Sequence, residues 1–221
     1  MKRVGTIFIC IGVIIAVSPL AGELYMNHKR EELYNQYVKN SSTEGIELEN
    51  YNNNVSSSLD KEDKLEKKMN RSKLLEVETK VKLDYSAIKL GEVIGKVIIP
   101  SIEVELLIIE GESDKNLGLG AGHMMHTAYP GEKGNCVLAG HRNYTFGSMF
   151  NRLGEVVLGA EIHVETKNII FTYVVDEIEI IEPTKLDILN QPENEKRITL
   201  LTCHPINIGN KRLLVKGHLL E

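Results

Sequence analysis

The chain has 221 residues, of which 42% are hydrophobic and 26% charged, with 26 Lys and Arg against 31 Asp and Glu. This balance is typical of one folded domain with additional segments, and it excludes a wholly disordered chain, a collagen and a polytopic membrane protein. The net charge of -5 also argues against a nucleic-acid-binding protein, because phosphate binding requires clustered Lys and Arg. Three cysteines, Cys10, Cys136 and Cys203, are too few for a disulfide framework.

The first expected element is a membrane-spanning helix. Residues 4–22 carry no charge and follow Lys2 and Arg3. As a helix this stretch is roughly 28 Å long, close to the hydrocarbon thickness of a bilayer. We therefore assign residues 1–25 to a cytoplasmic tip and a single-pass anchor, with the N-terminus inside and the rest of the chain outside. The alternative is a cleavable signal peptide with residues 7–17 as its apolar region.

Residues 26–83 are expected to form a polar stalk. Asn-rich and Ser-rich patches at residues 50–54 and 56–58 precede a run of mixed charge at residues 60–71. Apolar residues are too sparse here to bury a core, which favours a solvated or loosely helical spacer. The alternative is a short amphipathic helix around Leu65 that packs on the following domain.

Residues 84–221 are long enough for a sizeable core, and their pattern is that of a β domain. Short β-branched runs alternate with Gly and Pro turn signals, as in a barrel or a sandwich. The expected strands lie at residues 92–99, 104–109, 135–139, 161–165, 169–175, 198–202 and 213–217. Helical signals are confined to one or two turns near residues 146–153 and 184–189. The alternating glycines of residues 118–122 lack a surrounding strand–helix unit, so no dinucleotide fingerprint is expected.

Three residues at strand ends carry the candidate chemistry. Cys203 ends a strand pattern and is followed by a His-Pro pair, and proline does not continue a central strand. His141 ends another apolar strand, and Arg212 begins the last one. Taken singly, each has a plain interpretation: a buried structural cysteine, a loop histidine and a solvated edge charge.

Taken together, the three residues suit acyl transfer through a thioester. A neighbouring imidazolium or guanidinium stabilises a thiolate, and an imidazole can protonate a leaving amine. A guanidinium also offers fixed donors to a developing oxyanion. His204 is the main rival of His141 as the partner of Cys203, although alternation along an extended chain would turn it to the other face.

Residues 199–203 read TLLTC, residues 139–142 read AGHR, and Arg212 lies nine residues beyond Cys203. This combination resembles the sortases, the cysteine transpeptidases of Gram-positive bacterial surfaces, over about residues 94–217. Further similar segments, in the order of the family, are residues 94–102, 118–123 and 129–131. The Gly-His pair at residues 122–123 and the Cys-His-Pro sequence are most similar to class D, and no Asp-Pro-aromatic lid motif of the pilin-polymerising class is present.

The resemblance implies a mainly β fold, a closed eight-stranded barrel with short helices. It implies cleavage of an LPXTG-type sorting signal between Thr and Gly, with Cys203 as the nucleophile. His141 would be the general acid and later the general base, and Arg212 would position the substrate and stabilise the oxyanion. The implied partners are surface proteins with a C-terminal sorting signal and an amine of a peptidoglycan precursor, met at the outer face of the cell membrane.

The remaining expectations concern individual polar residues. Substrate contacts are expected for Thr202, His123 and Asn143, and a structural role is the alternative for His123. No cofactor is expected, since the histidines form no tight ligand cluster. Some sortases bind calcium through acidic loops, but here a solvated face is expected for Glu177, Glu179 and Glu182. Cys136 is expected to be an inert core residue.

Two other functions stay open at this point. The domain is either an enzyme or a non-catalytic β module anchored in the cell envelope, which binds or scaffolds other proteins. A thiol hydrolase that uses water would share the acyl-enzyme with a transpeptidase.

Overall fold

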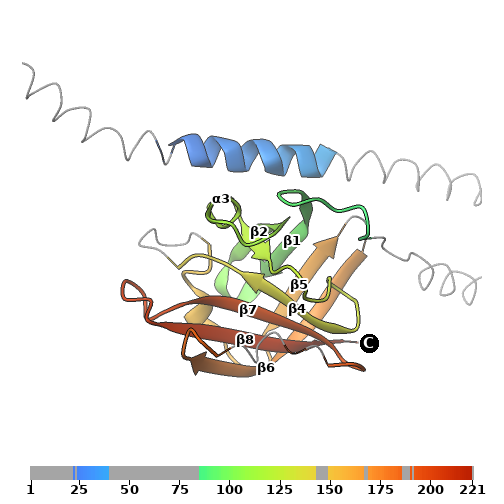
Figure 1. The fold of residues 1–221 in the computed structure, drawn as a ribbon, viewed down its shortest axis with the longest axis vertical. Coiled ribbons are helices and arrows are strands. Elements are labelled where there is room, and N and C mark those ends of the chain that lie inside the picture. Colours follow the sequence, from blue (N-terminus) through green and yellow to red (C-terminus); the bar gives the residue numbers. More distant parts are fainter. Residues whose placement is uncertain are drawn as a thin grey trace, which may run out of the picture.

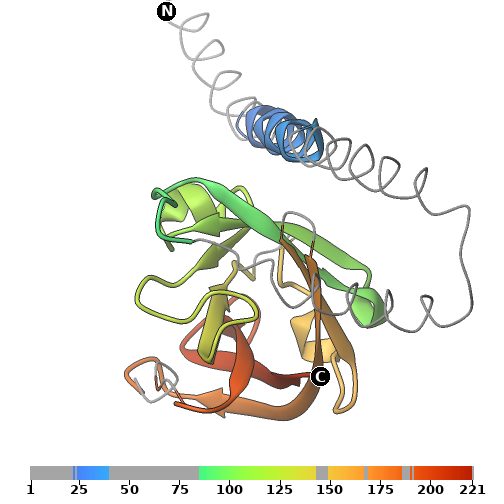
Figure 2. The ribbon, with the colours of Figure 1, turned by 90° about the vertical axis from the view of Figure 1, so that its right-hand side faces the viewer.

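The structure is a computed structural model that describes residues 22, 24–39, 85–142, 149–166, 169–185, 190 and 192–220. Eight strands close into one barrel in the order β1-β2-β3-β4-β7-β8-β6-β5 (Figures 1 and 2). The strands are β1 (Val93–Ile99), β2 (Val104–Glu110), β3 (Ala121–His123), β4 (Gly134–Ala139), β5 (Glu161–Thr166), β6 (Ile169–Ile181), β7 (Lys196–His204) and β8 (Lys211–Leu219). The short helices are η1 (Pro100–Ile102), α3 (Asp114–Leu117) and η2 (Leu153–Glu155). The expected closed eight-stranded β-barrel is confirmed.

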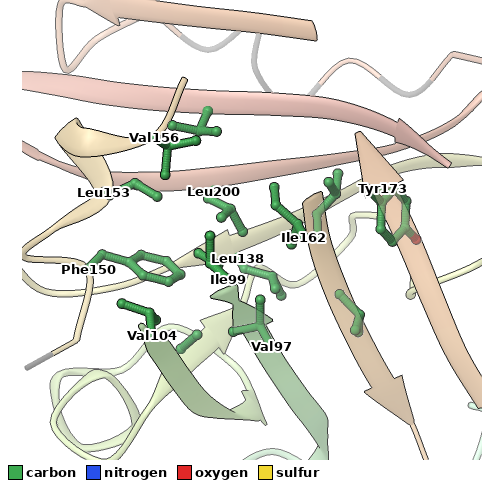
Figure 3. Close-up of a cluster of buried hydrophobic side chains, with 14 of the residues drawn as sticks. Val97, Ile99, Val104, Leu138, Phe150, Leu153, Val156, Ile162, Tyr173 and Leu200 are labelled. Carbon is green, nitrogen blue, oxygen red and sulfur yellow. The ribbon is translucent and has the colours of Figure 1, made fainter. Parts of the chain in front are cut away.

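The core follows from the alternation of side chains along these strands. Val97, Ile99, Leu138 and Leu200 are all 0% exposed and point into the barrel. Figure 3 shows such side chains converging from β1, β4 and β7, with Leu153 of η2 closing the cluster. Burial of a large aliphatic side chain contributes about 1.5–3 kcal/mol, so this layer holds the strands in register.

Two parallel pairings determine where the strand ends meet. β2 pairs in parallel with β3, and β4 pairs in parallel with β7, whereas the other neighbours are antiparallel. All six residues of β4 are buried, as expected for a strand covered on both faces. Because β4 and β7 run in the same direction, their C-terminal ends lie side by side.

The expected strands are all present, with small differences at their ends. β3 was not expected, because it has three residues and reads Ala-Gly-His, without a β-branched run. β6 continues to Ile181 through a bulge between Val175 and Glu177. Within the described part of the helical signal near residues 146–153, η2 begins at Leu153, and residues 143–148 and 186–189 lie outside the described residues.

Residues 24–39 form a helix that packs on the outside of the barrel (Figures 1 and 2). Met26, Leu33 and Tyr37 contact a small apolar cluster formed by Leu107, Ile109 and Leu119. The Tyr37 hydroxyl also donates a hydrogen bond to a barrel backbone carbonyl at 3.4 Å. These residues fall on one face of the helix, so the start of the segment expected to be a stalk is a docked helix.

The other expectations for the N-terminal part of the chain concern residues that the structure does not describe. Within the described residues, no helix has the length and apolarity needed to cross a membrane. The expected anchor lies almost entirely outside those residues, as does the helix considered around Leu65.

Candidate active site

Cys203 and Arg212 are direct cross-strand neighbours. Cys203 is the penultimate residue of β7 and Arg212 the second residue of β8, and the two are paired in the antiparallel register. Directly opposed residues in such a pair have Cβ atoms about 4.5–5.5 Å apart and project to the same face. The turn between β7 and β8 thus places the guanidinium-bearing residue beside the thiol.

His141 follows the end of the neighbouring parallel strand, two residues beyond β4. Ala139 at the end of β4 pairs with Leu201 of β7, and the Gly140 amide donates to the Leu201 carbonyl at 3.0 Å. Ala139 and Leu201, which are 62 positions apart in the sequence, are therefore neighbours, and His141 and Cys203 each lie two residues beyond this pair.

All three residues belong to the outer face of the barrel. The inward face of their strands is defined by core residues Leu138, Leu200 and Leu213. His141, Cys203 and Arg212 each lie an odd number of residues from these positions, and alternation turns them outward. The sequence-predicted trio therefore lies at the adjoining ends of three adjacent strands, with His141 two residues beyond β4, Cys203 in β7 and Arg212 in β8.

Backbone carbonyls of the β7–β8 turn, close to Cys203, hold the guanidinium of Arg212. Arg212 Nη1 donates to the backbone carbonyls of Gly209 and Lys211, both at 2.9 Å. A Cβ atom added to Gly209 would lie 3.9 Å from Cys203 Sγ, so this glycine borders the sulfur. Among the described residues no hydrogen bond uses Nε or Nη2 of Arg212. Cys203 is a free, half-buried cysteine.

The opposite face of the same strand ends carries a second set of contacts. The Thr202 hydroxyl donates to the Gly140 carbonyl at 2.7 Å, and Arg142 Nη1 donates to His204 Nδ1 at 3.1 Å. His204 is thereby turned away from the face of Cys203, which leaves His141 as the neighbouring imidazole. Arg142 was missed as a functional residue in the sequence, although its spacing to His204 repeats that of His141 to Cys203.

Two of the expected substrate-binding residues require correction. Thr202 is 2% exposed and its hydroxyl is bound to backbone, so it positions the end of β4 instead of facing a substrate. His123 is 1% exposed, with Nδ1 2.8 Å from Glu110 Oε2 and Nε2 3.0 Å from the Ala128 carbonyl. It is a structural residue of the barrel interior. Asn143, the third, lies outside the described residues.

The acidic residues considered for calcium face lysines. Lys216 lies 3.1 Å from both Glu177 and Glu179, and Lys211 lies 3.5 Å from Glu182. Among the described residues no cluster of three or more metal-ligating side chains occurs. These carboxylates form a solvated, charge-paired face.

Cys136 is the other described cysteine, and it is 1% exposed in the core of the barrel. Burial raises the pKa of the Cys136 thiol far above its ordinary value, because a thiolate is poorly solvated there. Cys136 is therefore an inert core residue, as expected, and Cys203 is the accessible thiol.

Comparisons with known proteins identify relatives of this chain. Sortase D of Bacillus subtilis (strain 168) is 32% identical over 130 residues, which cover 58% of this chain and 64% of that protein. Sortase A of Bacillus anthracis is 30% identical over 128 residues, covering 58% and 60% of the two chains. A solved structure of a Clostridium perfringens sortase D5 transpeptidase superimposes with a TM-score of 0.57 at 35% identity, covering 70% of this chain and 89% of that one.

The match thus spans less than two thirds of the length of the two Bacillus proteins. The resemblance to class D seen in the sequence is supported by two of these three relatives. The model of the sortase domain family matches residues 97–220, which is more than half of the chain and includes His141, Cys203 and Arg212. The chain belongs to the sortase family.

Proposed function

We propose that this protein is a cysteine transpeptidase that cleaves an LPXTG-like sorting signal between Thr and Gly and transfers the surface protein to a cell-wall amine. The observation that carries the proposal is the pairing of three strands, which sets Cys203 opposite Arg212 and brings the end of β4, two residues before His141, beside β7. Membership of the sortase family supports the same chemistry.

In this mechanism the Cys203 thiolate attacks the carbonyl carbon of the threonine in the sorting signal. The carbonyl electrons move to oxygen, and the resulting oxyanion accepts hydrogen bonds from Nε and Nη2 of Arg212, whose Nη1 is held by the β7–β8 turn. Protonated His141 donates its proton to the glycine nitrogen, and the C–N bond breaks to leave a thioester on Cys203.

The second half of the reaction uses the same residues in reverse. Neutral His141 accepts a proton from the attacking amine of a peptidoglycan precursor. The amine nitrogen bonds to the thioester carbonyl, the C–S bond breaks, and the Cys203 thiolate is regenerated beside protonated His141. One proton is thus donated and one regained in each cycle.

The proposal places this chemistry at the outer face of the cell membrane. The uncharged stretch at residues 4–22, preceded by Lys2 and Arg3, supports a single-pass anchor with its N-terminus inside. The barrel would then meet secreted surface proteins that carry a C-terminal sorting signal.

The test uses the full chain with a fluorogenic LPXTG-type peptide, and intact-mass analysis to detect the acyl-enzyme. We expect a thioester adduct on Cys203, and loss of cleavage in Cys203→Ala and His141→Ala. Product analysis with and without an added amine separates transfer from hydrolysis by water. Full cleavage by Cys203→Ala would overturn the assignment of the nucleophile. An unreactive Cys203 thiol in the wild-type chain would leave a non-catalytic envelope module.

A further inference from the structure

We infer that Arg142 is a positioning residue, and that its hydrogen bond to His204 holds the ends of β4 and β7 in the register that sets His141 opposite Cys203. The inference rests on the proposed function for its kinetic consequence. The bond itself lies on the face opposite the thiol, so Arg142 acts through the backbone of its neighbours.

Backbone pairing ends just before the candidate catalytic residues. The last backbone hydrogen bond between the two segments joins the Gly140 amide to the Leu201 carbonyl at 3.0 Å. Beyond it, no backbone hydrogen bond of the described residues joins residues 141–142 to residues 203–204. His141 and Cys203 therefore lie beyond the last paired residues, where backbone hydrogen bonds between the two segments no longer fix their separation.

The contact between Arg142 and His204 replaces the missing ladder bonds. Each residue directly follows one of the candidate catalytic residues, so the 3.1 Å bond spans the gap one step beyond them. Nε of Arg142 also donates to the Asn151 carbonyl at 3.2 Å. The planar guanidinium is thus held at two points, which gives the link a defined direction.

Donor and acceptor roles make this link specific. A guanidinium only donates, so His204 Nδ1 must accept, and the neutral imidazole carries its proton on Nε2. No carboxylate of the described residues forms an ion pair with Arg142. Burial lowers the pKa of Arg142, yet a guanidinium remains charged near neutral pH.

Gly154 provides an independent way to disturb the contact. A Cβ atom at this exposed glycine would lie 2.6 Å from Nη2 of Arg142 and 3.6 Å or more from its other guanidinium atoms. Alanine at residue 154 would therefore displace the guanidinium without removing any of its partners. This substitution tests the position of the charge separately from its presence.

The decisive comparison uses His204→Asn against His204→Leu in the full chain. Asparagine places its carbonyl oxygen near the position of Nδ1 and retains the acceptor, whereas leucine removes it. We expect His204→Leu, Arg142→Met and Gly154→Ala to lower kcat about tenfold or more with KM little changed, since small displacements of reacting groups have such effects. His204→Asn should stay within about twofold of wild type, and Arg142→Met combined with His204→Leu should lose no more than either alone. Arg152→Met removes a nearby arginine that, among the described residues, forms ion pairs with Glu103 and Glu155, and it should leave kcat unchanged.

A second readout does not depend on the peptide substrate. The rate of Cys203 alkylation by iodoacetamide reports on the surroundings of the thiol, and it should change in Arg142→Met and His204→Leu in the same direction as in His141→Ala. This pattern without any peptide cleavage would support the positioning role while refuting the proposed substrate class. Equal activity of His204→Leu and His204→Asn, or multiplied losses in the double variant, would overturn the inference. Should Arg142→Met fail to fold, the His204 pair and Gly154→Ala still decide the matter.

Discussion

Replacing Thr202 with valine should destabilise the barrel and impair the candidate active site together. The Thr202 side chain is 2% exposed, and its hydroxyl donates to the Gly140 carbonyl at 2.7 Å. Valine has nearly the same shape but no donor, so the carbonyl is left without this partner in a buried position. An unsatisfied buried group of this kind costs about 1–3 kcal/mol.

A loss of about 2 kcal/mol corresponds to a fall in Tm of roughly 4–8 °C for a chain of this size. The assay is thermal unfolding followed by circular dichroism, with kcat measured on the same preparations. Thr202→Ser is the matched control, because it retains the hydroxyl and removes only a methyl group, and it should retain most of the kcat. Because Gly140 directly precedes His141, we expect Thr202→Val to lower kcat as well. Equal Tm and kcat in the valine and serine variants would refute a role for the hydrogen bond.

Three further predictions concern other parts of the molecule. Arg212→Ala should lower kcat about 10²–10³-fold, the usual cost of losing an oxyanion donor. Arg212→Lys should restore little of this activity, because one ammonium cannot bind the turn carbonyls and the oxyanion together, and near-wild-type turnover of the lysine variant would refute this. Leu33→Ala should loosen the helix at residues 24–39 and speed its amide hydrogen exchange, while Leu24→Ala, at a residue 66% exposed, should not; equal exchange rates in the two variants would contradict the docking. Burial raises the pKa of Cys136, so the contribution of its neutral thiol to stability is fully present below the unfolded pKa of about 8.5 and is lost as the pH rises further. Between about pH 8 and 10 the Tm of Cys136→Ala should therefore fall less steeply than the Tm of wild type, and parallel curves of Tm against pH would exclude the effect.

The barrel was predictable because its strands are marked by runs of β-branched residues. β1 and β7 have such runs between turn signals, and both were expected within two residues of their observed ends. β3 has no such run, and its three residues are held as a strand by pairing with β2 and β4. Its structure is therefore a tertiary effect that local sequence does not report.

The candidate site was predictable to the extent that its residues match a known family. Cys203, His141 and Arg212 were predicted from their motifs, and the pairing of the strands explains why the ends of β4, β7 and β8 lie side by side. For His123 the sequence left a substrate contact and a structural role open, and only its buried contact with Glu110 in the structure decides for the structural role. Arg142 was overlooked because its partner lies 62 residues away and on the far face of the sheet.

The helix at residues 24–39 was overlooked for a different reason. Its barrel-facing residues Met26, Leu33 and Tyr37 are separated by polar residues, so the whole segment resembles a solvated spacer in composition. Only the apolar cluster on the barrel gives these residues something to pack against. Local composition could not distinguish a spacer from a helix that is stabilised by its docking site.

The docking of the helix at residues 24–39 limits what a change in the length of the N-terminal region would do to the position of the barrel. Since residues 24–39 already touch the barrel, residues 40–84 connect two points of the same body. With the proposed membrane anchor, lengthening or shortening residues 40–84 would leave the helix on the barrel, because the helix is held there by its own contacts. The orientation of the barrel toward incoming polypeptides would then depend on the few residues that join that anchor to the helix.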